Sequence, residues 1–208
     1  MFEHRLFTDF VTLFVVINPI NLIPYFVLFT RHQPPKERQR TALRSVVIAA
    51  AILVVFIVLG QILLEALGIH LPSFSIAGGL VLLAISLRTI LASEQGPEEE
   101  EKEQSSGHAR DVAVFPLATP LIAGSGAILA VVLLTDNEQF GFVEQAQTTL
   151  VMLAILAITY VVLLAAGPIQ RILGTTGADV VSRVLGLILA ALSVEIVIEG
   201  IRASFSLA

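Results

Sequence analysis

The sequence contains no cysteine and few charged residues. Without cysteine the chain has no disulfide, no thiolate chemistry and no cysteine-ligated metal. Charged residues make up 14% of the chain and hydrophobic residues 56%, against about 25% and about 45–50% in soluble domains. The mean hydropathy is +0.89. The composition therefore predicts an integral membrane protein, and spans of about 20 residues each leave no room for a separate soluble domain.

Further absences exclude several kinds of enzyme. The histidines are scattered without metal-ligand spacing, so no metal site is predicted: His4, His32, His70 and His108. The segment around Ser125 lacks the Gly-x-Ser-x-Gly frame of a serine hydrolase, and no Walker A sequence is present to hydrolyse ATP. We therefore expect no catalytic residues, no resident cofactor and no enzyme activity, and nothing in the sequence indicates a nucleic-acid partner.

Five runs lack Asp, Glu, Lys and Arg, at residues 10–30, 45–64, 66–87, 112–135 and 145–170. A sixth apolar stretch, 180–201, is interrupted by Arg183, Glu195 and Glu199. Each can cross about 30 Å of hydrocarbon as a helix, whereas strands of a membrane barrel would alternate apolar and polar residues. The first run is about twice as long as the apolar part of a signal peptide and has no cleavage site after it. The predicted class is an all-α membrane protein with six transmembrane helices.

Positive charge is distributed unequally between the two sides that six spans define. Connections after spans one, three and five hold ten basic residues: Arg31, Lys36, Arg38, Arg40, Arg44, Arg88, Lys102, Arg110, Arg171 and Arg183. The opposite side holds Arg5 and Arg202. The positive-inside rule then places those connections in the cytoplasm and both termini outside. The prediction is a multi-pass protein of the cell inner (cytoplasmic) membrane.

The chain divides into two halves around an acidic connection. Residues 93–110 contain six glutamates with Gly, Pro and Ser, a composition that is typical of a flexible loop. Residues 1–92 and 111–208 then each hold three spans of one membrane domain. The segment 79–88 aligns with 186–195 at an offset of 107, and Pro19 aligns with Pro120 at an offset of 101. Because each half has an odd number of spans, the second would enter the membrane inverted, as in many secondary transporters.

Helix-breaking residues concentrate in spans one and four, at Pro19 and Pro24 and at Pro116 and Pro120 with Gly124 and Gly126. Proline removes a helical hydrogen bond, and glycine costs a helix about 1 kcal/mol relative to alanine. We expect both spans to be broken near mid-membrane. Free backbone groups at that depth must lie in protein or line a wet cavity, and the N-terminus of a half-helix attracts an anionic group. Carbonyl and amide oxygens at the same breaks can hold a cationic group. Two such breaks therefore suit a small zwitterion.

The candidate substrate-binding groups are the polar residues at the breaks and the adjoining glycine backbone: Asn18, Asn21, Thr119, Gly124, Ser125 and Gly126. The alternative is that these side chains only cap the half-helices. Glu195 and Glu199 lie four residues apart on one helix face. They are candidates for ion coupling, or they mark the outer interface with Arg202. Asp9 and Arg88 are interpreted as span ends.

The segments Asn18-Pro-Ile-Asn-Leu-Ile-Pro24 and Phe115-Pro-Leu-Ala-Thr-Pro-Leu-Ile-Ala-Gly-Ser-Gly-Ala127, with the stretch 183–201, resemble the MarC family of inner-membrane proteins along essentially the whole chain. Positions that match the family's two motifs are Asn18, Pro19, Pro24, Pro116, Leu117, Pro120, Leu121, Gly124, Gly126 and Ile128. The chain departs at Ser125, where the family usually has proline, and at Asn21, where it often has glycine. The resemblance implies a six-span relative of amino-acid exporters of the lysine-exporter type, some archaeal relatives being described as glycine and alanine transporters.

The leading hypothesis is a secondary transporter of a small neutral amino acid such as glycine or alanine, working by alternating access. A proton or sodium ion would be the coupling ion, and the partners would be the substrate and the lipid bilayer. A passive channel or pore, an exporter of another small solute, and an intramembrane enzyme or structural partner stay open as alternatives. Substrate, coupling ion, transport direction and oligomeric state are not fixed by the sequence.

Overall fold

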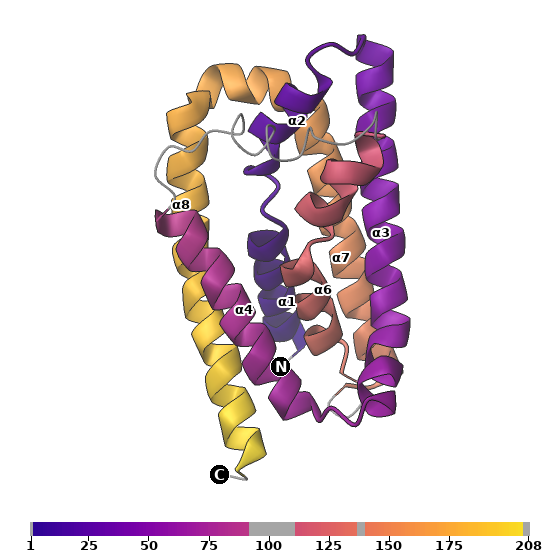
Figure 1. Ribbon diagram of the computed structural model, residues 1–208, viewed down its shortest axis with the longest axis vertical. Coiled ribbons are helices and arrows are strands. Elements are labelled where there is room, and N and C mark those ends of the chain that lie inside the picture. Colours follow the sequence, from indigo (N-terminus) through magenta and orange to yellow (C-terminus); the bar gives the residue numbers. More distant parts are fainter. Residues whose placement is uncertain (1, 92–110, 137–139, 206–208) are drawn as a thin grey trace.

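The computed structural model describes residues 2–91, 111–136 and 140–205, and the predicted acidic loop 93–110 lies outside them. Within these residues every regular element is a helix (Figure 1), which confirms the all-α class. The elements are α1 (Phe2–Ile17), α2 (Leu22–Thr30), α3 (Pro35–Ala66), α4 (Leu71–Leu91), η1 (Ala113–Ile122), α6 (Ser125–Leu134), α7 (Phe142–Leu164) and α8 (Ala166–Ser204). By length and composition four helices can cross a membrane, or six spans if each of two bent pairs counts as one.

The first and fourth spans are broken, as the sequence predicts. Arg5–Ile17 and Leu22–Thr30 meet at 43°, and Ala113–Ile122 and Ser125–Leu134 meet at 54°. In Figure 1 the chain climbs through α1 and α2 and descends through η1 and α6. Each bent pair is followed along the chain by two long helices, α3 and α4 in the first half and α7 and α8 in the second.

The fifth and sixth spans have different limits from those predicted. The run 145–170 does not form one helix, because α7 ends at Leu164 and α8 begins at Ala166. Pro168 falls in the first turn of α8, where a helix tolerates proline. Gly174 then interrupts α8 with φ 64° and ψ −179°, and the membrane-length part is Gly177–Ser204. Figure 1 shows the first part of α8 crossing the upper end before the helix turns downward.

The second and third spans are separated by a glycine turn. α3 ends at Ala66, and Gly68 follows with φ 68°, a left-handed conformation that commonly terminates helices. The N–H of Ile69 donates to the carbonyl of Leu64 at 2.9 Å. The third span therefore begins at Leu71 and not at residue 66.

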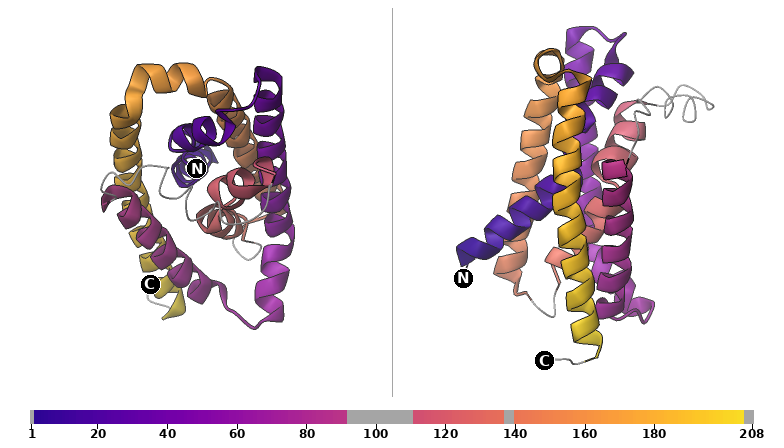
Figure 2. Two further views of the ribbon diagram at one scale, coloured as in Figure 1. Left: turned by 45° about the horizontal axis from the view of Figure 1, so that its top comes forward. Right: turned by 90° about the vertical axis from the view of Figure 1, so that its left-hand side faces the viewer.

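Helices α4 and α8 lie side by side in the views of Figures 1 and 2 and approach closely at glycines. A Cβ added at Gly79 of α4 would lie 2.9 Å from the carbonyl oxygen of Ser193 in α8. A Cβ added at Gly186 of α8 would lie 3.5 Å from the carbonyl oxygen of Ser86 in α4. Small residues at such contacts let helix backbones pack directly in membranes. The two contacts are reciprocal, since Gly186 and Ser193 are the residues that the offset of 107 pairs with Gly79 and Ser86.

The main hydrophobic core lies among α1, α2, α3, η1, α6 and α7. Its fully buried members include Leu13, Phe26, Leu53, Leu117 and Met152. A smaller cluster joins Val15 of α1 to Leu82 of α4 and Leu189 of α8. Through this cluster the α4–α8 pair packs against the first half of the broken span α1–α2.

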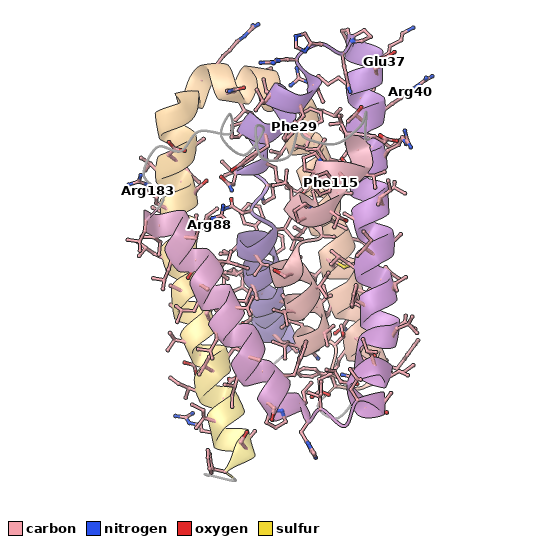
Figure 3. The ribbon with its side chains drawn as sticks, viewed as in Figure 1. Phe29, Glu37, Arg40, Arg88, Phe115 and Arg183 are labelled. Carbon is pink, nitrogen blue, oxygen red and sulfur yellow. The ribbon has the colours of Figure 1, made fainter. Side chains whose placement is uncertain are left out.

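The labelled basic residues that the sequence assigns to one side lie in the upper half of the molecule as drawn in Figure 3. Figure 3 shows Glu37 and Arg40 at the start of α3, with Arg88 of α4 and Arg183 of α8 also in the upper half. Arg5 and Arg202 belong to helix ends in the lower half of the same view. The grouping by ends agrees with the predicted distribution of charge, and the side of the membrane that each end faces stays a prediction.

Candidate functional site at the two helix breaks

The first break is held by an asparagine in a left-handed conformation. Asn18 has φ 46°, which asparagine adopts more readily than most residues because its short side chain can bond to nearby backbone. The backbone N–H of Asn21 lies 3.3 Å from the Asn18 Oδ1 atom and 3.1 Å from the Asn18 carbonyl oxygen. Asn18 thus holds the turn that precedes α2, which is the capping role considered as the alternative to substrate binding.

The second break is built from prolines and a glycine. Inside η1, Phe115 (φ −136°, ψ 125°) and Thr119 (φ −135°, ψ 122°) are extended, each directly before a proline, Pro116 or Pro120. This follows from the steric restriction that proline places on the residue before it. At the end of the break, a Cβ on Gly124 would clash with the Pro120 carbonyl oxygen. Only glycine fits this approach without a shift of the backbone.

The structure brings the two breaks together. A Cβ added at Gly126, in the first turn of α6, would lie 3.3 Å from Val16 Cγ1, two residues before Asn18. The same atom would lie 3.1 Å from Leu82 Cδ2 and 3.5 Å from Ile85 Cδ1 of α4. The start of α6 therefore packs between the end of α1 and the middle of α4, so the second break lies against the helix that leads into the first.

The predicted binding residues differ in their exposure. Thr119 and Ser125 are exposed, whereas Asn18, Asn21 and Gly124 are partly buried. The Ser182 hydroxyl of α8 donates to the Asn21 Oδ1 atom at 3.5 Å. The sequence analysis did not single out Ser182, because one serine in a long apolar helix carries no local signal. This contact adds α8 to the elements around the first break.

Glu195 and Glu199 are not brought to the breaks. Both are exposed on α8, toward the C-terminal end of the span Gly177–Ser204. Between them, Ile196 packs against the cluster of Val15, Leu82 and Leu189, and Val197 packs against Gly79 of α4. The structure thus places both carboxylates on the outer surface of the bundle, away from the groups that surround Asn18 and Ser125.

A buried polar network that the sequence analysis missed lies at the opposite end from Arg40 and Arg183. Asp9, interpreted above as a span end, is only 2% exposed and belongs to the bent span. Its Oδ2 atom accepts a hydrogen bond of 2.7 Å from Thr148 of α7 and lies 3.9 Å from Arg5 Nε. Arg5 also pairs with Glu144 at 3.1 Å and stacks over the Phe140 ring at 3.7 Å. The network links α1 to α7.

A second buried polar contact lies at the turn after α6. The Gln61 amide of α3 donates to Asp136 Oδ1 at 3.1 Å and to the Thr135 carbonyl at 3.3 Å. Gln61, Thr135 and Asp136 are all buried. The Arg5 guanidinium reaches the Leu134 carbonyl at 3.4 Å, so both contacts converge on the C-terminal end of α6. Sequence spacing could not reveal these pairs, because their members come from separate helices.

These observations define a multi-pass, all-helical membrane protein with two broken spans packed against each other. The model of the MarC family of integral membrane proteins matches residues 3–205. The chain belongs to the MarC family.

Named relatives cover nearly the whole chain. A UPF0056 membrane protein of Methanocaldococcus jannaschii is 35% identical over 194 residues, which are 93% of this chain and 94% of that protein. One from Archaeoglobus fulgidus is 34% identical, covering 94% and 91% of the two chains. The UPF0056 membrane protein YhcE of Escherichia coli is 32% identical, covering 96% and 93%. No solved structure matches the chain.

Proposed function

We propose that this protein is a secondary transporter of the inner membrane that moves a small neutral amino acid, such as glycine or alanine, by alternating access. The observation that carries the proposal is the close approach of the two broken spans, where a Cβ added at Gly126 would lie 3.3 Å from Val16 Cγ1. Broken helices that meet inside a bundle are where secondary transporters bind substrate, because half-helix ends offer free N–H and carbonyl groups.

The binding site in this proposal uses the two short helices. The first residues of α6, Ser125 and Gly126, have N–H groups that precede the first helical hydrogen bond, from Ile128 to the Gly124 carbonyl. They suit a substrate carboxylate. The amide oxygen of Asn21 and the hydroxyl of Thr119 suit the ammonium group. The glutamates of α8 take no part in this binding.

The alternating motion would follow from two inverted halves. The reciprocal contacts of Gly79 with Ser193 and of Gly186 with Ser86 support this arrangement, because a two-fold axis pairs residue i with j and j with i. The chain directions of the two bent pairs in Figure 1 also agree with it. The positive-inside rule orients the end with Arg40 and Arg183 toward the cytoplasm.

Transport by purified protein tests the proposal. Proteoliposomes should accumulate radiolabelled glycine or alanine when a proton or sodium gradient is imposed, and preloaded unlabelled amino acid should drive counterflow. Uptake should saturate with substrate concentration, as expected of a carrier. Single-channel currents without counterflow would assign a pore, and the absence of uptake across a panel of amino acids in both orientations would contradict the proposal.

A further inference from the structure

Asp9 is a deeply buried carboxylate that the binding site described above does not use. It lies in α1, about 14 Å along a helix from Asn18 at 1.5 Å per residue. An ionisable group inside a span is expensive in hydrocarbon and usually serves a function. Asp9, Leu13 and Ile17 share a buried face of α1, so this helix connects the carboxylate rigidly to the first break.

We propose that Asp9 binds the proton that drives this carrier and that Thr148 adjusts its hydrogen bonds to the charge of Asp9. The inference deepens the proposed function and rests on it for the coupling of the proton to transport. It replaces the suggestion, made from sequence, that Glu195 and Glu199 carry the coupling ion.

The Thr148 hydroxyl has a different partner for each protonation state of Asp9. Its single proton can be donated to Asp9 Oδ2 at 2.7 Å or to the Glu144 carbonyl oxygen at 3.2 Å. When Asp9 is ionised, Thr148 donates to it. When a proton binds Asp9, the new O–H donates to Thr148 Oγ1, and the threonine proton turns to the Glu144 carbonyl. A hydroxyl has one donor and two acceptor sites, so both arrangements satisfy it.

Arg5 keeps a negative partner in both states. Its Nη1 atom pairs with Glu144 Oε1 at 3.1 Å, while its Nε atom lies 3.9 Å from Asp9 Oδ2. Neutralising Asp9 therefore leaves the half-buried Arg5 still paired with Glu144, whereas an arginine left without a carboxylate at such a place would be unfavourable. Asp136 beyond α6 and Gln61 of α3 form a second polar contact at this end. The Thr148 hydroxyl can accept the hydrogen bond of a protonated Asp9, and for this reason the proposal assigns a proton and not a sodium ion to the site.

The polar network of Asp9 extends to the surface at one end of the molecule. The side chains are 32% exposed at Glu144, 20% at Arg5 and 3% at Asp9, so exposure falls stepwise along the network. A proton from this side reaches Asp9 past two charged groups. The charge distribution orients this end toward the outside, where a proton gradient directed into the cell would supply it.

The experiment compares the wild type with Asp9→Asn, Thr148→Val and Thr159→Val in lipid. Thr159→Val is the matched control, because Thr148 and Thr159 are both fully buried on α7 and the Thr159 hydroxyl donates only within its own helix, to the Ile155 carbonyl. Thr148→Val keeps the carboxylate and the side-chain volume, so it tests the proposal even if Asp9→Asn fails to fold.

Two measurements test separately whether Asp9 binds a proton and whether that proton drives transport. Infrared titration should show a protonated-carboxyl band that is absent in Asp9→Asn, shifted along the pH axis in Thr148→Val and unchanged in Thr159→Val. In proteoliposomes with radiolabelled glycine and alanine, Asp9→Asn should lose the stimulation of uptake by a pH gradient and keep counterflow. A wild type that transports neither amino acid would contradict the proposed function, while the infrared titration would still decide whether Asp9 binds the proton.

Several results would overturn the inference. One is a carboxyl band that is the same in Asp9→Asn and the wild type. Another is pH-gradient stimulation that survives in both Asp9→Asn and Thr148→Val. Loss of that stimulation in Glu195→Gln with Glu199→Gln, with Asp9→Asn unaffected, would assign the proton to α8. Uptake driven by sodium alone would exclude a coupling proton.

Discussion

The two broken spans bend by similar angles, 43° and 54°, yet different chemistry produces each bend. In the first, one left-handed asparagine and its hydrogen bond to Asn21 hold the turn. In the second, two prolines force extended backbone and Gly124 sits against the Pro120 carbonyl. Two residues that the sequence offset of 101 aligns therefore have different roles. Asn18 bonds to its own backbone, whereas Thr119 has an exposed side chain.

The second break should be the more sensitive to a single added methyl group. In Gly124→Ala the Cβ would collide with a backbone carbonyl, which cannot rotate away. We expect a loss of about 1–3 kcal/mol in the free energy of unfolding, as for overpacked sites. Helix propensity alone would favour alanine over glycine here, and the contact with the Pro120 carbonyl reverses that preference. Thermal unfolding in detergent measures the loss.

Gly126→Ala is the matched control for this prediction. Its Cβ would meet the ends of the Leu82, Val16 and Ile85 side chains at 3.1, 3.3 and 3.5 Å, and side-chain ends can shift. The loss should therefore be smaller than for Gly124→Ala. Equal stability of Gly124→Ala and the wild type would show that the Pro120 carbonyl does not hold the second break.

The first break should depend on backbone conformation as well as on a hydrogen bond. Asn18→Ala places alanine at φ 46°, which costs about 1–2 kcal/mol, and removes an acceptor worth about 1 kcal/mol. Asn18→Gly adopts the same φ without a steric cost and loses the hydrogen bond. The order of unfolding temperature should be wild type, then Asn18→Gly, then Asn18→Ala. If glycine is as damaging as alanine, the asparagine side chain alone holds the turn.

The smallest effects on stability are expected at the exposed residues of the second break. Thr119→Ala and Ser125→Ala should change the free energy of unfolding by no more than about 0.5 kcal/mol, as for most surface substitutions. Affinity for glycine, measured by equilibrium binding, should nevertheless fall in Thr119→Ala, because the proposed site loses the hydroxyl that suits the ammonium group. Ser125→Ala keeps its backbone N–H and should bind glycine nearly as the wild type does. Unchanged affinity in Thr119→Ala would remove this hydroxyl from the binding site.

Much of the architecture could be predicted because it depends on local composition. Runs without charge predict spans, and proline at 19, 116 and 120 predicts breaks, since a missing N–H interrupts a helix in any environment. The limits of spans five and six were wrong because the turn at Ala165 lies inside an apolar run and carries no charge to mark it. The sequence identified the two segments that form the candidate site. It did not show that Asn18 caps the turn, because this role depends on the φ angle of Asn18 in the folded chain.

The sequence by itself determined that the chain lies in lipid, is helical and interrupts two of its spans, because hydrophobicity and proline chemistry act within a few residues. Tertiary structure decided which polar groups are buried. Asp9 meets Thr148 across 139 positions of sequence, and Glu195 and Glu199 lie on the outer surface of α8. In helices that are apolar on every side, no periodicity marks the inward face. Only the packing of helices from both halves determines which carboxylate is enclosed.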